Sequence, residues 1–388
     1  MKQGIPLLSR RALTKCFLGA MVSPGVSPRL LDSMRVRSLQ LPNRMVMAPL
    51  TRGRAGVQRT ANALMAEYYS QRASAGLIVT EGVAISPRGY GWLGSPGIYT
   101  DAHVVGWKAV TESVHQKGGR IFLQLWHTGR VSHPDFQDGE TPIGPSAIAA
   151  DDDTHTPSGK KKYVTPRAMT QRDISDATRE FAQAAERAWR AGFDGVEIHA
   201  ANGYLIDQFI RDGSNHRTDA YGGSVQNRLR FLLEVTEAVA QVVPVDRIGV
   251  RLSPTNPYND MLDGDPAATF TQAAKALNRF GLAYLHVVDS VARDPAQAQH
   301  RVAPRMRAVF EGPLILNGGY DAVTGAAALD AGEADLIAYG RNFLANPDLV
   351  ERFRRGAPLN RPDSSTFYTE GPKGYTDYAS LDNAADKS

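Results

Sequence analysis

The sequence has almost no cysteine. Its 388 residues contain one, Cys16, which excludes an intramolecular disulfide and any zinc or iron–sulfur site built from several cysteines. A reducing compartment suits such a chain best. The sequence also lacks an apolar run of about 18 residues, the minimum for a membrane-spanning helix, so no membrane partner is expected. These absences favour a cytoplasmic protein, with targeting to an organelle as the alternative.

Acidic residues are scarce at one end of the chain only. The net charge is +4, but 7 of the 44 Lys and Arg residues and one of the 40 Asp and Glu residues fall within residues 1–37, which leaves 37 basic and 39 acidic residues. The body of the protein is therefore slightly acidic. A basic surface that binds nucleic acid is not expected.

Residues 1–28 contain Arg10 and Arg11 and no acidic residue. Three interpretations are open: a twin-arginine signal, an organelle transit peptide, or an upstream start codon with Met21 as the true initiator. In each case the segment is a leader or a disordered extension outside the fold. The fold is expected within residues 29–378, and residues 379–388 are expected to form a flexible tail.

Eight short apolar runs alternate with eight helix-favouring segments. A strand buried on both faces of a parallel sheet is a short, nearly continuous apolar run. The expected strands are 45–50, 77–85, 121–126, 195–199, 248–252, 284–288, 314–316 and 336–339. The expected helices are 62–73, 101–116, 175–191, 224–242, 266–280, 302–310, 321–331 and 347–355. This alternation predicts an α/β protein with one domain, a closed (β/α)8 TIM barrel.

Three further local features bear on this fold. Gly192 and Gly332 are placed to supply the left-handed residue that ends a helix before the next strand. The segment 131–172, rich in Pro, Gly, Asp and Lys, is an insertion after the third strand. We expect it either over the mouth of the active site or as a surface excursion.

Reactive side chains of such a barrel project from the C-terminal ends of its strands. Gly318 and Gly319 follow the seventh expected strand, and Gly340 and Arg341 follow the eighth. Glycine lets backbone N–H groups approach an anion closely, and the arginine adds a charged donor. The sequence therefore predicts a phosphate site, although ordinary turns are the alternative for each pair taken alone.

Neutral and cationic donors stand at three other strand ends. Thr51, Gln124 and Arg251 suit the carbonyl groups of an isoalloxazine ring, and an arginine there favours the anionic reduced flavin. A satisfied core amide is the alternative for Gln124, and a structural ion pair is the alternative for Arg251. No pair of acidic residues accompanies them, which argues against a barrel glycosidase.

His199, Asn202 and Tyr204 lie within six residues after the fourth strand. A histidine N–H and an amide N–H can hold one carbonyl or nitro oxygen, which leaves the tyrosine hydroxyl to deliver a proton. A lone histidine at a strand end is more often structural, but three polar groups at the catalytic end favour a site.

Several motifs resemble those of the Old Yellow Enzyme family. They are 43–52 (NRMVMAPLTR), 124–130 (QLWHTGR), 195–199 (GVEIH), 203–204 (GY), 221–224 (YGGS), 317–320 (NGGY), 340–341 (GR) and 374–378 (GYTDY). They occur in the family's order and spacing, and the resemblance covers residues 30–378.

The resemblance implies roles for individual residues. Those expected to contact FMN are Pro49, Leu50, Thr51 and Gly82 along the ring, Gln124 and Arg251 at its pyrimidine edge, and Gly318, Gly319, Gly340 and Arg341 at its phosphate. His199 and Asn202 match the pair that holds the activating oxygen, and Tyr204 matches the proton donor. Tyr90, Trp126 and Tyr368 match aromatic positions that line the substrate pocket, although Thr369 and Glu370 replace the glycines often found after the last.

The resemblance also implies an activity. We expect an FMN-dependent ene-reductase that takes hydride from NADPH or NADH and reduces α,β-unsaturated carbonyls, maleimides or nitroalkenes in a ping-pong reaction. The expected partners are small enone or nitro substrates, the expected assembly is a monomer or homodimer, and no metal is expected. A nitro or nitrate-ester reductase on the same fold is the alternative enzyme, and a flavin-binding sensor is the alternative of another class.

Overall fold

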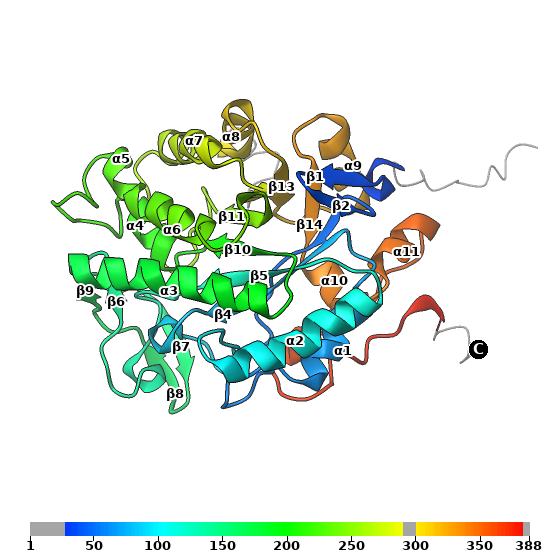
Figure 1. Ribbon diagram of the computed structural model, residues 1–388, viewed down its shortest axis with the longest axis horizontal. Coiled ribbons are helices and arrows are strands. Elements are labelled where there is room, and N and C mark those ends of the chain that lie inside the picture. Colours follow the sequence, from blue (N-terminus) through cyan, green and yellow to red (C-terminus); the bar gives the residue numbers. More distant parts are fainter. Residues whose placement is uncertain (1–27, 290–299, 383–388) are drawn as a thin grey trace, which may run out of the picture.

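Eight parallel strands close into a barrel in the order β10, β11, β12, β13, β14, β3, β4, β5 (Figure 1). The computed structural model describes residues 28–289 and 300–382, so the expected leader lies outside the described residues except for its last residue. The strands are β3 (Met45–Met47), β4 (Leu77–Ala84), β5 (Ile121–Trp126), β10 (Gly195–His199), β11 (Ile248–Leu252), β12 (Tyr284–Val288), β13 (Leu314–Asn317) and β14 (Leu336–Tyr339). The predicted (β/α)8 barrel is confirmed.

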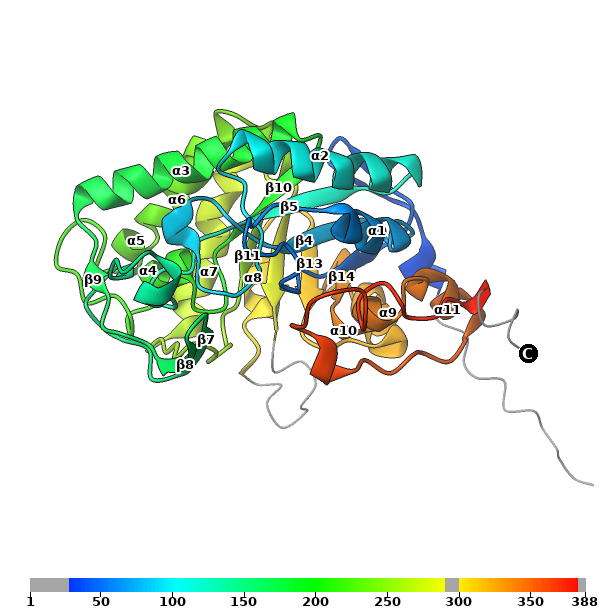
Figure 2. The same ribbon diagram turned by 90° about the horizontal axis from the view of Figure 1, so that it is seen from below.

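Helices surround this barrel. They are α1 (Ala63–Gln71), α2 (Asp101–Gln116), α3 (Gln171–Arg190), α4 (Leu205–Ile210), α5 (Val225–Arg228), α6 (Arg230–Ala240), α7 (Pro266–Leu277), α8 (Ala303–Val309), α9 (Ala322–Asp330), α10 (Arg341–Ala345) and α11 (Leu349–Arg355). In the second view, α2 and α3 run along one side of the barrel (Figure 2). The two expected helix-ending glycines both have a positive φ, 85° at Gly192 and 71° at Gly332.

Several element boundaries differ from the prediction, and two of the larger differences have a clear physical reason. The first strand ends at Met47 instead of residue 50, because Pro49 has no N–H for the ladder. Helix α3 begins four residues earlier than expected, where Thr170 and Asp173 form a reciprocal capping box. The expected helix 224–242 divides at Leu229 into α5 and α6.

A short hairpin closes the end of the barrel where the strands begin. Strands β1 (Met34–Val36) and β2 (Leu39–Leu41) pair antiparallel and pack Val36, Leu39 and Leu41 against the first residues of several barrel strands. These strands are too short for a periodic signal, and the sequence did not predict them. The hairpin removes apolar barrel residues from water at the end opposite the site.

The insertion 131–172 folds into small paired strands. β6 (Ile143–Gly144) pairs with β9 (Arg167–Ala168), and β7 (Asp153–Thr156) forms a hairpin with β8 (Gly159–Lys162), which lies at the opposite end of the molecule from β1 and β2 (Figure 1). Val131, Ala150 and Tyr163 of the insertion form a cluster against Tyr204. The insertion therefore packs beside the predicted site.

The first residues of the segment expected to be a flexible tail, 379–388, contact the body of the protein. The backbone carbonyl of Ala379 accepts hydrogen bonds from Arg352 and Asn360, both at 2.8 Å, and the backbone N–H of Leu381 donates to Asp348 at 2.7 Å. These contacts tie residues 379–381 to α11, and residues 383–388 lie outside the described part of the chain. Within that part, no helix is both long and apolar enough to cross a membrane.

Candidate active site

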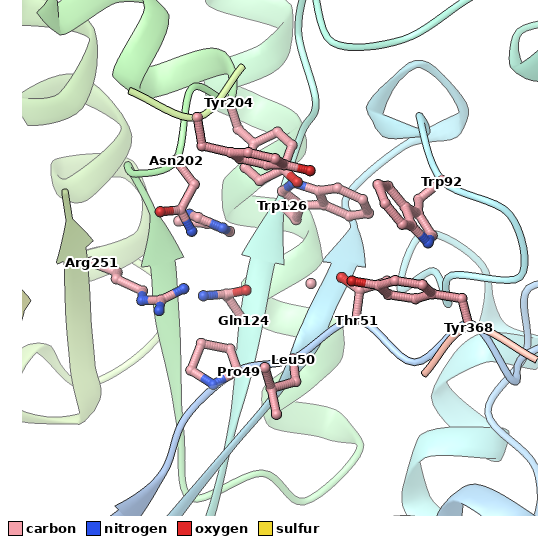
Figure 3. A pocket seen from close by; sticks show the side chains of 13 residues that line it. Pro49, Leu50, Thr51, Trp92, Gln124, Trp126, Asn202, Tyr204, Arg251 and Tyr368 are labelled. Carbon is pink, nitrogen blue, oxygen red and sulfur yellow. The ribbon is translucent and has the colours of Figure 1, made fainter. Parts of the chain in front are cut away.

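A cavity of about 260 Å³ lies at the C-terminal ends of the barrel strands (Figure 3). The predicted residues that it brings together are Pro49, Leu50, Thr51, Gly82, Gln124, Trp126, His199, Asn202, Tyr204, Arg251 and Tyr368. They come from five strand ends and from the segment that follows α11. The barrel register aligns several of them, because Gln124 stands opposite Gly82 on β4 and His199 stands opposite Arg251 on β11.

A second cavity of about 290 Å³ adjoins the first through Leu50, which lines both. Gly318, Gly319, Gly340 and Arg341 line it, as predicted for the phosphate site. Gly318 has φ 153°, and a Cβ there would lie 2.1 Å from the carbonyl oxygen of Asp289, so only glycine fits. Arg341 is exposed and forms no side-chain hydrogen bond or ion pair within residues 28–289 and 300–382.

The first cavity has both a hydrogen-bond acceptor and a hydrogen-bond donor at its base. Gln124 Nε2 donates to Glu197 Oε1 at 2.8 Å, which leaves the amide oxygen as an acceptor. Arg251 Nη2 donates to Asn317 Oδ1 at 3.0 Å, while its buried Nε has no partner among the described residues. An unsatisfied buried guanidinium N–H is costly, so a polar ligand is expected here. Figure 3 shows Arg251 and Gln124 pointing toward one another below the cavity.

These observations fit FMN. One cavity offers an acceptor, an arginine donor and apolar walls suited to a ring system, and the adjoining cavity offers a glycine turn and an exposed arginine suited to a phosphate. Asn317 connects the two, since it accepts from Arg251 and donates to the carbonyl of Ala338 at 2.9 Å.

His199 is a neutral donor. Its side chain is buried, and Nδ1 has no hydrogen-bond partner among the described residues. Burial, followed by the charge of Arg251, holds the pKa of His199 well below its usual 6.5. The imidazole is therefore uncharged at neutral pH and carries one N–H.

Asn202 presents its N–H₂ group to the cavity. Asn256 Nδ2 donates to Asn202 Oδ1 at 2.9 Å, so the amide nitrogen of Asn202 is the end left for a ligand, and it points toward the cavity (Figure 3). The backbone of Asn202 is left-handed, with φ 57°, and its N–H donates to Ser253 Oγ at 2.7 Å. Asparagine tolerates this conformation better than most residues.

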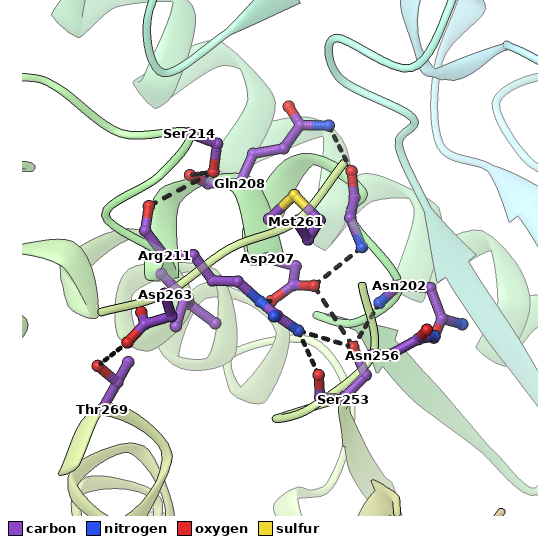
Figure 4. Close-up of polar contacts among 12 residues, drawn as sticks. Asn202, Asp207, Gln208, Arg211, Ser214, Ser253, Asn256, Met261, Asp263 and Thr269 are labelled. Atoms are coloured by element: carbon purple, nitrogen blue, oxygen red, sulfur yellow. Dashed lines mark hydrogen bonds and ion pairs between the residues drawn. The ribbon is translucent and has the colours of Figure 1, made fainter. Parts of the chain in front are cut away.

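A buried ion pair supports the turn after Asn202 (Figure 4). Asp207 Oδ1 pairs with Arg211 Nε at 3.0 Å, Asp207 Oδ2 accepts from the backbone N–H of Gly203 at 2.9 Å, and Arg211 also donates to the carbonyl of Ser253. Both partners make further hydrogen bonds besides the ion pair, which offset part of the cost of burying them. This ion pair fixes the path of the chain between Asn202 and Tyr204.

Tyr204 is a protonated acid. It precedes α4, and its ring meets Trp126 and His199 edge-on, with centroid distances of 5.1 and 5.0 Å. Burial, followed by the nearby tyrosines 258, 163 and 368, raises the pKa of Tyr204 well above 10. The hydroxyl therefore keeps its proton at any working pH and can serve as a general acid.

The prediction that Tyr90 lines the pocket is wrong. Tyr90 does not line the cavity; its side chain is buried against Ala84 and Phe136, with the Arg59 guanidinium carbon 3.5 Å from its ring centroid. Thr128, Ser132 and Gln137 all donate to the Tyr90 carbonyl, which holds the backbone in a position that turns the ring into the protein.

Two other aromatic residues line the cavity and were not predicted. Trp92, two residues after Tyr90, has its ring centroid 5.0 Å from that of Tyr368, and Tyr258 stands half exposed at the rim. Both lie on irregular loops, where no hydrophobic period indicates which side chain turns inward. Their only sequence signal is that each loop follows the C-terminal end of a strand.

The fold and the two cavities define a flavin-dependent oxidoreductase built on a barrel. Residues 29–360 match the model of the NADH:flavin oxidoreductase / NADH oxidase family. The chain is 43% identical over 376 residues to 12-oxophytodienoate reductase 1 of Oryza sativa subsp. japonica, with 95% of this chain and 97% of the relative covered. It is also 43% identical over 356 residues to a protein of Leishmania infantum named as a probable flavin mononucleotide-dependent alkene reductase, with 90% and 96% covered.

Solved structures give the same result. Morphinone reductase in complex with tetrahydroNAD superimposes with a TM-score of 0.87 and 48% identity, over 92% of this chain and 99% of that one. The old yellow enzyme homologue of Zymomonas mobilis gives a TM-score of 0.88 and 46% identity, over 91% and 99%. The chain belongs to the NADH:flavin oxidoreductase family, the Old Yellow Enzyme family predicted from its motifs. The expected enzyme class, an FMN-dependent NAD(P)H oxidoreductase of the ene-reductase type, is confirmed.

Proposed function

We propose that this enzyme reduces the C=C bond of small α,β-unsaturated ketones, aldehydes, maleimides and nitroalkenes. The observation that carries the proposal is a set of two uncharged N–H donors, His199 and Asn202, and an uncharged acid, Tyr204, around one cavity whose described lining residues include no carboxylate. Such a set suits a neutral substrate that becomes negatively charged on one oxygen as it reacts.

We assign the cofactor contacts as follows. Pro49, Leu50, Thr51 and Gly82 lie along the flavin ring, and Gln124 accepts from the pyrimidine edge while Arg251 donates to it. Gly318, Gly319, Gly340 and Arg341 hold the phosphate. The bound flavin supplies hydride to the substrate and recovers it from NADPH or NADH.

The protein's own residues act on the substrate oxygen and on one carbon. His199 and Asn202 donate hydrogen bonds to the carbonyl or nitro oxygen and stabilise its growing negative charge. Tyr204 delivers its proton to the α-carbon as the β-carbon receives hydride. Trp92, Trp126 and Tyr368 line the cavity with aromatic rings against which a substrate can pack. Because one cavity serves both the nicotinamide and the alkene, the two bind in turn, which gives ping-pong kinetics.

We further propose that the enzyme works in a reducing compartment, in the cytoplasm or inside an organelle, as a monomer or a homodimer. The single cysteine supports the first statement. Fractionation of cells that express the full chain tests the compartment, and light scattering of the purified protein tests the assembly.

Two half-reactions test the function. The purified protein should carry the absorbance bands of oxidised flavin, lose them when NADPH or NADH is added without oxygen, and regain them when 2-cyclohexenone or N-ethylmaleimide follows. A protein that cannot be reconstituted with FMN contradicts the proposal. Reoxidation by nitrate esters at rates far above those of every alkene would replace it with the nitro or nitrate-ester reductase.

A further inference from the structure

A buried carboxylate stands behind the base of the cavity and touches none of the substrate-facing residues described above. Glu197 lies on β10, two residues before His199, and its side chain is fully buried. Oε1 accepts from Gln124 Nε2 at 2.8 Å, and Oε2 contacts the Tyr284 hydroxyl at 3.1 Å and His286 Nδ1 at 2.8 Å. Three neighbours on β5 and β12 therefore hold the carboxylate in place.

The first consequence concerns orientation. An amide can present either its oxygen or its N–H₂ to a ligand, but an ionised carboxylate only accepts hydrogen bonds. Glu197 must therefore face the N–H₂ end of Gln124, and the amide oxygen is left for the cavity. The choice between acceptor and donor at the cavity base is made by Glu197.

The second consequence concerns charge. Arg251 lines the same cavity and is buried, with an unpartnered Nε among the described residues. Burial lowers the pKa of Arg251 and the Glu197 carboxylate opposes that shift. For Glu197 burial is outweighed by His286 and then by Arg251, so its pKa lies below the usual range. The carboxylate thus compensates the arginine's positive charge from inside the barrel.

We infer that Glu197, held by Tyr284 and His286, is a positioning residue that fixes Gln124 as an acceptor and sets the reduction potential of the flavin through its charge. The inference rests on the proposed placement of FMN between Gln124 and Arg251. Reduction adds negative charge to the flavin ring, so the net charge behind Arg251 changes the balance between oxidised and reduced cofactor.

Two substitutions separate the two roles. Glu197→Gln keeps the shape and removes the charge, which leaves Arg251 uncompensated and favours reduced FMN. For one buried unit charge at an effective dielectric constant of about 20, the affinity ratio of reduced to oxidised FMN should rise on the order of tenfold, equivalent to a potential about 30 mV more positive for a two-electron couple. Glu197→Asp keeps the charge but shortens the reach to Gln124. It should weaken FMN binding. The affinity ratio of reduced to oxidised FMN should stay within twofold of the parent's.

The measurement is a spectroelectrochemical titration of the holoenzyme, with FMN affinity from fluorescence during reconstitution. Asp263→Asn is the matched control, because it removes another buried carboxylate, one that accepts from Thr269 and lies outside both cavities. It should leave the potential unchanged. If Glu197→Gln does not fold, Tyr284→Phe removes one hydrogen bond from the carboxylate and should shift the potential by less than half of the predicted amount.

Three results overturn the inference: a folded Glu197→Gln protein with the parent's potential, an equal shift in Asp263→Asn, or a Glu197→Asp protein whose potential moves as far as that of Glu197→Gln. Failure of the parent chain to bind FMN would instead contradict the proposed function. The two failures are therefore distinguishable.

Discussion

Replacing Tyr204 with phenylalanine should stop one half-reaction and spare the other. The ring keeps its edge-on contacts with Trp126 and His199, at centroid distances of 5.1 and 5.0 Å, so packing in the cavity is preserved. Only the hydroxyl is lost. Transfer of hydride from NADPH or NADH to the flavin requires no proton on a substrate carbon, whereas alkene reduction does.

The expected magnitude follows from the state of that hydroxyl. Because burial raises the pKa of Tyr204 well above 10, essentially every molecule carries the transferable proton at neutral pH, and no part of the parent rate is limited by ionisation. Loss of a positioned general acid costs about 10² to 10⁴ in rate, which corresponds to about 2.7 to 5.4 kcal/mol of activation free energy. Nitroalkenes should lose least, because a nitronate is stable enough to leave and to be protonated by water.

Stopped-flow traces of the two half-reactions measure this directly. Tyr163→Phe is the matched control, since Tyr163 packs against Tyr204 but does not line the cavity. Equal slowing of both half-reactions in Tyr204→Phe would make Tyr204 a residue that positions the flavin. If neither slows and Tyr258→Phe loses alkene reduction instead, the proton comes from the rim of the cavity and the mechanism is wrong at its central step.

Three further predictions concern the phosphate site, the oxygen-holding pair and acid stability. Arg341→Ala should weaken FMN binding by about 1.5 to 3 kcal/mol, measured by titrating the apoprotein with FMN. Arg361 is an exposed arginine outside both cavities, so the control variant Arg361→Ala should leave the FMN affinity unchanged. His199→Ala should weaken binding of a para-substituted phenol. A titration monitored by the long-wavelength absorbance band of the phenol with oxidised flavin measures this affinity, and an unchanged affinity would place His199 away from the ligand. Burial, and then the charge of Arg88, lowers the pKa of His127 to about 3. Because the unfolded chain takes up this proton at a higher pH than the folded protein, the free energy of unfolding decreases as the pH falls from 6.5 toward 3. His127→Asn keeps an acceptor for the Gly129 N–H and should remove about 2 kcal/mol of the loss between pH 7.5 and 5; equal losses in urea titrations of both proteins would exclude His127 as the cause.

The barrel was predictable because each strand is buried on both faces. A run such as Ile121–Trp126 is apolar at nearly every position, and the structure gives it the same bounds as the prediction. Elements stabilised mainly by distant partners carry no such signal. Strands β1 and β2 depend on the barrel floor, and the division of the helix at Leu229 has no glycine or proline to mark it.

The site was predictable where a residue sits at a strand end and less so on loops. Gln124, His199 and Arg251 point into the cavity because the barrel register leaves no other direction. Tyr90 and Trp92 are two residues apart on one loop, and it is tertiary contacts, among them the hydrogen bonds to the Tyr90 carbonyl, that place the Tyr90 ring in the protein interior and leave Trp92 at the cavity. The sequence contains Asn256 and Glu197 as well, but their effect on the amide groups of Asn202 and Gln124 is visible only in three dimensions.

Desolvation prepares both kinds of catalytic group at once. Burial lowers the pKa of His199 and raises the pKa of Tyr204, so the imidazole is uncharged and the phenol is protonated over the whole neutral range. Both groups are then in the state that the proposed reaction needs, and none of the described residues that line the cavity is a carboxylate. A carboxylate at that position would repel the negative charge that forms on the substrate oxygen. Glu197, a buried carboxylate near the cavity, is instead placed behind Gln124, where it can act on the cofactor without facing the substrate.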